Sequence, residues 1–260
     1  MGSVLKVIIL AGGLGTRLSE ETDVKPKPMV LIDGKPVLWH LMNSFSAQGY
    51  HDFVIALGYR GEVIKRWLMD LYDLSGDITI DSKSKEIQRS DGYLEHPWRV
   101  STFDTGLNSQ TGGRIAKCMS KLPGERVIAT YGDGLANVPI DRLLDFHKSH
   151  GKFATVTAVR PPARFGQLSI NDNRVSHFGE KSQTDSGWIN GGYFVLEPQV
   201  ADYVLNDDEP FETGALPRLV AEGELMAFCH ESFWQPMDTL REKNILNDLA
   251  KKNPPPWLSL

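Results

Sequence analysis

The first residues that could do chemistry lie near the N-terminus. Residues 10–18 read LAGGLGTRL, and the basic segment KPKP follows at residues 25–28. Glycine lets backbone N–H groups approach an anion closely, because it has no side chain to hold the ligand away. Arg17 and Lys27 add positive charge beside those amides. Bare amides next to cations are suited to binding a phosphate group.

Two common phosphate-binding motifs do not fit this segment. The dinucleotide-binding fingerprint needs a third glycine in Gly-x-Gly-x-x-Gly, but counting from Gly13 places Leu18 at that position. The P-loop ends in Gly-Lys-Ser/Thr, whereas Thr16 and Arg17 stand here without a preceding lysine. A glycine turn needed only to connect a strand to a helix would explain the glycines. It would not explain the cations that follow them.

Asp133 is a candidate metal ligand. It follows an apolar run in the segment TYGDG, and glycines flank it on both sides. Mg²⁺ prefers oxygen ligands, usually one or two carboxylates together with phosphate oxygens and water. The alternative interpretation is an aspartate that only stabilises a turn before Gly134.

Several elements must position these residues. Apolar runs typical of strands buried on both faces occur at Val4–Leu10, Phe53–Leu57, Val127–Thr130, Ala154–Val159 and Tyr193–Leu196. Helical patterns lie between them, at Val37–Gln48, Glu62–Leu71 and Ile140–Ser149. This alternation predicts an α/β fold with a Rossmann-like, mostly parallel sheet and helices on both faces. In such a sheet, ligands bind where the first glycine turn leaves the carboxyl end of its strand.

The second half of the chain has a different pattern. Short segments separated by turns, FGQLSINDNRVSHFGEK from Phe165 and WINGGYFVLEP from Trp188, predict a β-ribbon or meander over the edge of the sheet. A helix at Pro217–Glu222, a strand at Met226–His230 and a helix at Thr239–Lys251 are expected after it. The prolines of NPPPW favour an extended tail that packs Trp257 on the body or on a neighbouring subunit.

Composition excludes several classes of protein. The 260 residues are 41% hydrophobic, which is enough for a substantial core. A formal net charge of −5 argues against a nucleic-acid-binding protein, because such proteins usually carry a basic excess. Cys118 and Cys229 lie far apart without metal-ligand spacing, and no apolar run is long enough to span a bilayer. We therefore expect a cytoplasmic protein with no membrane partner.

The glycine-rich and KPKP segments together resemble the signature of the sugar-1-phosphate nucleotidyltransferases. Further segments are similar, in order and spacing, to the glucose-1-phosphate cytidylyltransferases of that family: PWRVSTFDTGLNSQTGGR, YGDGLANVPID, PPARFGQL, WINGGYFVL and FWQPMDTLREK. The resemblance spans nearly the whole chain. It implies that CTP and α-D-glucose 1-phosphate give CDP-glucose and pyrophosphate with Mg²⁺, for the biosynthesis of deoxysugars, O-antigen or other polysaccharides. It also implies a homo-oligomer, with the hexamer as the expected form.

The resemblance assigns roles to individual residues. It implies that Arg17 contacts the triphosphate, that Lys27 meets the α-phosphate and the sugar phosphate, and that Asp133 and Asp238 hold Mg²⁺. The implied nucleotide-binding residues are Leu10, Ala11, Gly12, Gly13, Leu14, Gly15, Thr16, Arg17, Lys27, Thr111, Gly112 and Gly132. The implied sugar-phosphate residues are Glu180, Lys181, Asn190 and Gly191. Ser182 departs from the family pattern, in which proline commonly follows the Glu-Lys pair.

Each of these assignments has a structural alternative. Asp238 could be the N-cap of the helix that begins near TLREK, and Thr111 could belong to an ordinary helix start. Glu180 and Lys181 could be solvated surface charges.

The expected organisation is a single domain, 1–260, with a nucleotide-binding core at 1–160, a β-rich sugar-binding part at 161–235 and a C-terminal helix and tail at 236–260.

Two functional alternatives remain open at this point. One is the same reaction with UTP, dTTP or another sugar phosphate, and the other is a non-catalytic protein that binds a nucleotide sugar and regulates a partner. The amino group of cytosine requires a hydrogen-bond acceptor. The sequence does not identify that acceptor.

Overall fold

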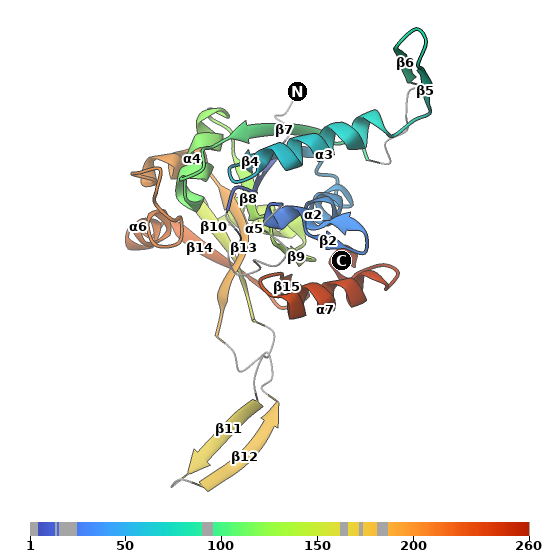
Figure 1. Ribbon diagram of the computed structural model, residues 1–260. Coiled ribbons are helices and arrows are strands. Elements are labelled where there is room, and N and C mark those ends of the chain that lie inside the picture. The colour runs from blue at the N-terminus through green and yellow to red at the C-terminus, as the bar shows by residue number, and fades with distance from the viewer. Residues whose placement is uncertain are drawn as a thin grey trace.

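The apolar runs assemble into one sheet in a computed structural model that describes residues 5–13, 15, 25–89, 96–161, 166–171, 174–180 and 187–259. Within these residues the sheet has seven strands (Figure 1). In spatial order they are β14 (Leu225–His230), β10 (Ala154–Val159), β13 (Ile189–Leu196), β8 (Val127–Tyr131), β1 (Lys6–Leu10), β4 (Asp52–Leu57) and β7 (Arg99–Asp104).

β1 lies inside the sheet, which explains why its sequence is apolar without alternation. It pairs in parallel with β4 on one side and with β8 on the other. Val7 and Ile9 contribute to the core on one face, whereas Ile8 and Leu10 contribute to the core on the opposite face. Burying each such side chain stabilises the fold by roughly 1.5–3 kcal/mol. The predicted burial of this strand on both faces is confirmed.

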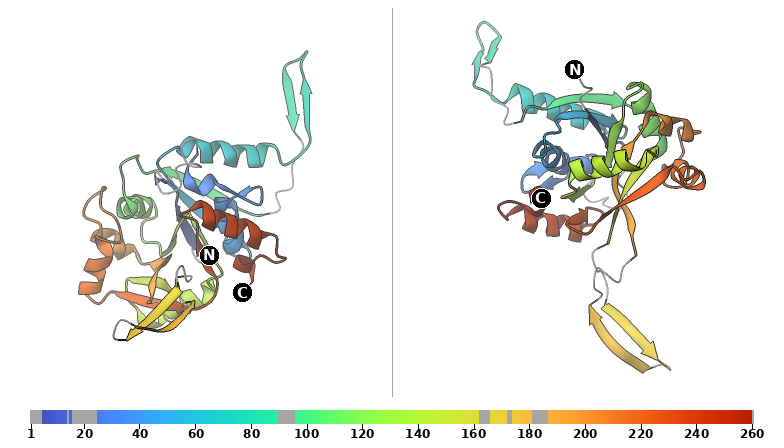
Figure 2. Two further views of the ribbon diagram at one scale, coloured as in Figure 1. Left: turned by 60° about the horizontal axis from the view of Figure 1, so that its bottom comes forward. Right: turned by 180° about the vertical axis from the view of Figure 1, so that it is seen from behind.

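Helices cover both faces of the sheet, as predicted (Figures 1 and 2). One face carries α2 (Val37–Ser46), α3 (Gly61–Asp73), α5 (Ile140–His150) and α7 (Leu240–Ala250). The other face carries α4 (Thr111–Ser120), the 3-10 helix η4 (Pro198–Tyr203) and α6 (Ala215–Ala221). Within the seven-stranded sheet the described pairings are parallel except those of β13, so the predicted mostly parallel α/β sheet is confirmed.

The prediction for the second half of the chain was partly wrong. The expected β-ribbon exists as the pair β11 (Gly166–Asn171) and β12 (Arg174–Glu180), but it extends away from the body (Figure 2). The following segment is not part of a meander at the sheet edge, whereas the buried strand predicted at Tyr193–Leu196 is confirmed. The segment forms β13, which lies between β10 and β8 and runs antiparallel to both. Its last six residues are buried, and an apolar run such as its last four residues needs cover on both faces.

Short pairs complete the described structure. They are β2 (Leu31–Ile32) with β3 (Lys35–Pro36), β5 (Ile78–Asp81) with β6 (Glu86–Arg89), and β9 (Gly134–Ala136) with β15 (Trp234–Pro236). Near the C-terminus, the 3-10 helix η5 (Pro256–Leu258) buries Trp257 to 1% exposure beside His40 and Phe233. The predicted packing of Trp257 on the body is therefore confirmed. Among the described helices, none combines the length and apolar character that crossing a membrane requires.

Candidate active site

The glycine turn, of which the structure describes residues 11–13 and 15, follows β1 at the carboxyl end of the sheet. It is held by backbone hydrogen bonds to residues of and after β4. The amide of Ala11 donates to Ala56 O at 3.0 Å, and Gly12 O accepts from the amide of Tyr59 at 3.1 Å. Gly12 O also accepts from Arg114 Nη2 at 2.9 Å. A Cβ atom at Gly12 would lie 2.2 Å from Arg114 Nη1, so any larger residue would have to displace the guanidinium of Arg114. Gly13 is exposed, with open space in front of it.

Lys27 lies in the 3-10 helix η2 (Lys27–Met29), which the flanking prolines define. Pro26 is the N-cap, and its carbonyl accepts from the amide of Met29 at 2.8 Å. Proline fixes φ near −65° and suits the first turn of a helix, so the KPKP sequence sets this backbone locally. The side chain of Lys27 is only 8% exposed. A buried ammonium requires negative partners.

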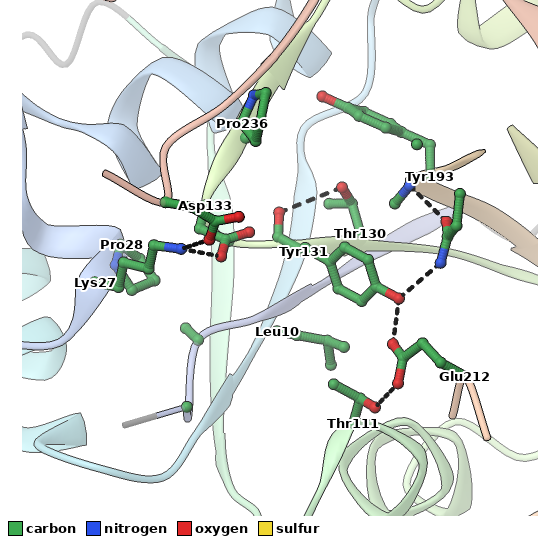
Figure 3. A pocket seen from close by; sticks show the side chains of 18 of the residues that line it. Leu10, Lys27, Pro28, Thr111, Thr130, Tyr131, Asp133, Tyr193, Glu212 and Pro236 are labelled. Atoms are coloured by element: carbon green, nitrogen blue, oxygen red, sulfur yellow. Dashed lines mark hydrogen bonds and ion pairs between the residues drawn. The ribbon is translucent and has the colours of Figure 1, made fainter. Parts of the chain in front are cut away.

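Two aspartates supply those partners. Lys27 Nζ donates to Asp133 Oδ2 at 2.6 Å and to Asp238 Oδ1 at 2.6 Å (Figure 3). Burial alone would lower the pKa of Lys27, but the charges and hydrogen bonds of Asp133 and Asp238 outweigh burial and raise that pKa. The side chains of Asp133 and Asp238 are 36% and 23% exposed, so both carboxylates remain accessible from the pocket.

Local structure explains where the two carboxylates point. Asp133 follows β8, and its carbonyl accepts from the amide of Met237 at 2.8 Å, which fixes the turn. α7 begins after the N-cap Thr239, which forms a capping box with Glu242. The amide of Asp238 donates to Glu242 Oε2 at 2.7 Å. The N-cap alternative for Asp238 is therefore wrong, and its carboxylate is turned toward Lys27 instead.

The glycine turn and the Lys27 group line one pocket of about 830 Å³. This volume is within the usual range for small-molecule sites. The sequence-predicted residues that line it are Leu10, Ala11, Gly12, Gly13, Gly15, Lys27, Thr111, Gly132, Asp133, Asn190, Gly191 and Asp238. The fold thus brings these twelve predicted residues together from separate parts of the chain.

A second polar group lies across the pocket from Lys27 (Figure 3). Thr111 Oγ1 donates to Glu212 Oε2 at 2.7 Å, and the hydroxyl of Tyr131 donates to Glu212 Oε1. Asn190 Nδ2 donates to that same hydroxyl at 3.0 Å. Burial, followed by the charge and hydrogen bond of Glu212, raises the pKa of Tyr131. The phenol is therefore protonated at neutral pH. We call these four side chains the Glu212 network.

The helix start at Thr111 has a structural role as well. Thr111 Oγ1 accepts from the amide of Phe211 at 2.8 Å. Gly112 does not line the pocket, since a Cβ atom there would meet Glu209 O at 2.7 Å. At Gly113 the corresponding contact, with Asp207 O, would be 2.2 Å. The two glycines therefore let α4 dock closely against the segment that carries Glu212.

Several predicted residues fall outside this description. Leu14, Thr16, Arg17 and Lys181 lie outside the described residues, and Glu180 is described only as the last backbone position of β12. Sequence reasoning did not assign roles to Tyr131, Arg114 or Glu212. Tyr131 immediately precedes the Gly-Asp-Gly turn, and Arg114 ends the segment PWRVSTFDTGLNSQTGGR, so both had a local signal. Glu212 had none, because its partners come from distant elements.

The described residues contain no group of three or more His, Cys, Asp or Glu side chains arranged to hold a metal ion. Asp133 and Asp238 form a pair, and both contact the same nitrogen atom of Lys27. A pair of carboxylates suits a metal ion whose other ligands are phosphate oxygens and water.

Comparisons with known proteins identify similar sequences and a similar fold. A family model described as nucleotidyl transferase matches residues 6–241. Glucose-1-phosphate cytidylyltransferase of Salmonella typhimurium is 48% identical over 254 residues, which cover 97% of this chain and 98% of that protein. Probable glucose-1-phosphate cytidylyltransferase of Bacillus subtilis is 38% identical over 256 residues, with coverage of 97% and 99%. The crystal structure of HddC from Yersinia pseudotuberculosis superposes with a TM-score of 0.70 at 24% identity, covering 95% of this chain and 100% of that one.

Proposed function

Because the chain belongs to the nucleotidyl transferase family, we propose that it transfers the cytidylyl group of CTP to α-D-glucose 1-phosphate, giving CDP-glucose and pyrophosphate. The names and near full-length similarity of the Salmonella and Bacillus relatives support this choice of substrates. The observation that carries the chemistry is the pairing of Lys27 with Asp133 and Asp238 beside the glycine turn.

The nucleophile needs no general base. A phosphate monoester has a second pKa near 6, so it is largely dianionic at neutral pH. One of its oxygens attacks the α-phosphorus of CTP, and the bond to the β-phosphate oxygen breaks to release pyrophosphate. The main barrier is the repulsion between a dianion and a triphosphate. The site must therefore supply positive charge and aligned hydrogen-bond donors.

Lys27 supplies one fixed positive charge on the pocket wall. It is held by two short ion pairs, so little reorganisation is needed when a phosphate approaches. We assign it to the α-phosphate and the sugar phosphate. The residues Leu10, Ala11, Gly12, Gly13 and Gly15, together with Gly132, are assigned to CTP, because they line the same pocket. Leu14, Thr16 and Arg17 complete the proposed nucleotide-binding segment, with Arg17 at the triphosphate. Thr111 is proposed at the base-binding end, and Gly112 supports it by letting the start of α4 dock against Glu209.

Nucleotidyl transferases generally use a divalent metal ion, and we propose Mg²⁺ here. Its donor requirements fit the site, because Asp133 and Asp238 present two partly exposed carboxylates close enough to contact one atom. These two residues would hold the ion. When bound, Mg²⁺ would neutralise charge on the phosphate oxygens of the reactants.

The glucose 1-phosphate is assigned to the part of the pocket lined by the start of β13, with its phosphate toward Lys27. Asn190 and Gly191 line that part, and Trp234 Nε1 donates to Gly191 O at 2.8 Å, which fixes this strand end. Glu180 and Lys181 are proposed to join them.

Pyrophosphate release tests the proposal directly. The protein is incubated with Mg²⁺, glucose 1-phosphate and, in separate reactions, CTP, UTP, dTTP, ATP or GTP. We expect turnover with CTP. Turnover with UTP alone would overturn the substrate assignment, and absence of turnover with all five would favour a nucleotide-sugar-binding regulator. Repeating the CTP reaction with other sugar 1-phosphates tests the choice of glucose.

We also propose a homo-oligomer, with a hexamer as the expected form. Ile80 and Ile87 face each other across the β5–β6 pair and are 70% and 56% exposed, which leaves an apolar surface to cover. Light scattering on the purified protein tests this, and Ile80→Lys should lower the measured mass.

A cytoplasmic location is proposed because the two cysteines are free, with Cys118 buried and Cys229 exposed.

A further inference from the structure

The Glu212 network joins four elements that are far apart in the sequence. Thr111 begins α4, Glu212 lies in the turn before α6, Tyr131 ends β8, and Asn190 lies in β13. Glu212 receives two hydrogen bonds from hydroxyl groups, one on each oxygen. Glu212 thereby connects α4, which carries the proposed base-binding residue Thr111, through Tyr131 to β13, which carries the proposed sugar-binding residue Asn190.

The hydrogen bonds in this network run in one direction. An ionised carboxylate can only accept, so Tyr131 must donate its single hydroxyl proton to Glu212. The phenol oxygen is then left as the acceptor for Asn190 Nδ2. The other end of the Asn190 side chain is assigned in the same way. The backbone amide of Gly192 can only donate, and it donates to Asn190 Oδ1 at 2.7 Å. The orientation of the Asn190 side chain is therefore set from both ends.

The position of a carboxylate in this pocket also needs a reason. The proposed ligands carry several negative charges, yet Glu212 lines the same pocket and is held there by the neutral hydroxyl groups of Thr111 and Tyr131. Lys27 offsets the charges of Asp133 and Asp238, whereas a carboxylate held by neutral hydroxyl groups is best tolerated where the ligand is neutral. Glu212 lies across the pocket from Lys27, with Tyr131 between them (Figure 3). Its end of the pocket therefore suits a neutral part of the ligands better than a phosphate, and the link through Tyr131 to Asn190 favours the hydroxyl groups of the sugar ring.

We propose that Glu212 and Tyr131 are positioning residues that hold the Asn190 side chain in the orientation needed to bind the hexose of the sugar 1-phosphate. This inference rests on the proposed function for the identity of the substrates. It adds two residues, Glu212 and Tyr131, that act through Asn190 rather than on the reacting atoms.

Steady-state kinetics of Tyr131→Phe and Glu212→Gln test the inference. Tyr131→Phe removes the hydroxyl that links Asn190 to Glu212, and Glu212→Gln replaces an acceptor by a group that can also donate. Each variant should raise KM for glucose 1-phosphate about tenfold, the equivalent of one hydrogen bond. For Tyr131→Phe, KM for CTP should stay within about twofold and kcat should change little, because Tyr131 is assigned neither to the base nor to the phosphates.

The double variant shows whether Tyr131 and Glu212 act through one chain of hydrogen bonds or independently of each other. If Tyr131 and Glu212 act through the same hydrogen bonds, the double variant should be no worse than either single variant. The matched control is Tyr203→Phe with Glu222→Gln. In that pair a tyrosine hydroxyl likewise donates to a glutamate, but on the exposed surface near α6 and outside the residues that line the pocket. It should leave both KM values unchanged.

Three results would overturn the inference: an unchanged KM for glucose 1-phosphate in Tyr131→Phe, additive effects in the double variant, or equal rises of both KM values in Tyr131→Phe. Failure of the proposed function looks different, because the wild-type protein would then not turn over CTP with glucose 1-phosphate. In that case the inference is tested by calorimetric titration of the wild-type protein and Tyr131→Phe with glucose 1-phosphate. Weaker binding by the variant supports the inference, and equal or absent binding overturns it.

Discussion

Replacing Asp133 by asparagine should abolish most of the transfer activity while leaving the fold nearly unchanged. Asparagine has the same shape and still offers Oδ1 to Lys27, so the substitution removes charge rather than volume. Lys27 also keeps its 2.6 Å ion pair with Asp238. The backbone carbonyl that accepts from Met237 is the same in both residues. The two effects, on stability and on activity, should therefore separate.

The expected changes in folding free energy and in activity differ greatly in size. The Asp133 side chain is 36% exposed, so loss of its charge should cost about 1 kcal/mol of folding free energy or less after solvent screening. For a chain of this size that lowers Tm by about 2–4 °C. Activity should fall by about 10²–10³-fold, as is typical when one charge-stabilising group is removed from a transition state.

The assay is pyrophosphate release with CTP, glucose 1-phosphate and saturating Mg²⁺, with Tm from circular dichroism. Asp145→Asn is the matched control, because that side chain is 78% exposed and pairs with Lys148 on the surface at 3.5 Å. It should change neither quantity. Turnover of Asp133→Asn within about threefold of the wild-type value would remove Asp133 from the chemistry. A fall in Tm of more than about 10 °C would show that the ion pair serves mainly the fold.

Three further predictions concern stability. Gly113→Ala should lower the urea midpoint clearly, because its Cβ would meet Asp207 O at 2.2 Å. Gly13→Ala has open space around the added Cβ and should fold normally. Because Gly13 lines the pocket, this variant should bind CTP more weakly in calorimetric titration. Trp257→Ala should cost about 3–5 kcal/mol in denaturant unfolding, because the ring is 1% exposed. Burial lowers the pKa of His40, so the unfolded chain binds a proton that the folded chain does not. The free energy of unfolding should therefore fall as pH drops below about 6.5, and His40→Gln should weaken that dependence in urea titrations at pH 7.5 and 5.5.

Some features of the site are encoded locally. The glycine turn follows β1 because an uninterrupted apolar run suits a strand buried on both faces, and glycines permit the tight turn after it. Lys27 is oriented by the prolines on either side of it. Asp133 lies directly after β8, so its position at the carboxyl edge of the sheet followed from the strand prediction.

Other features could not be predicted because they depend on which elements become neighbours. β13 has the composition of a ribbon or a core strand, and only its pairing with β10 and β8 placed it inside the sheet. The helix-cap interpretation of Asp238 failed because Thr239, one residue later, forms the capping box with Glu242. Both residues are good N-caps, so propensity alone did not distinguish them.

The sequence by itself determined the strand-and-turn framework, the family resemblance and the chemical types that the site would contain. These follow from periodicity and turn chemistry over a few residues. The tertiary structure decided that Lys27 meets Asp133 and Asp238, 106 and 211 positions away, and that Tyr131 meets Glu212, 81 positions away. Such contacts are set by strand order and by the close docking of helices on the sheet. A local pattern of residues contains no information about that geometry.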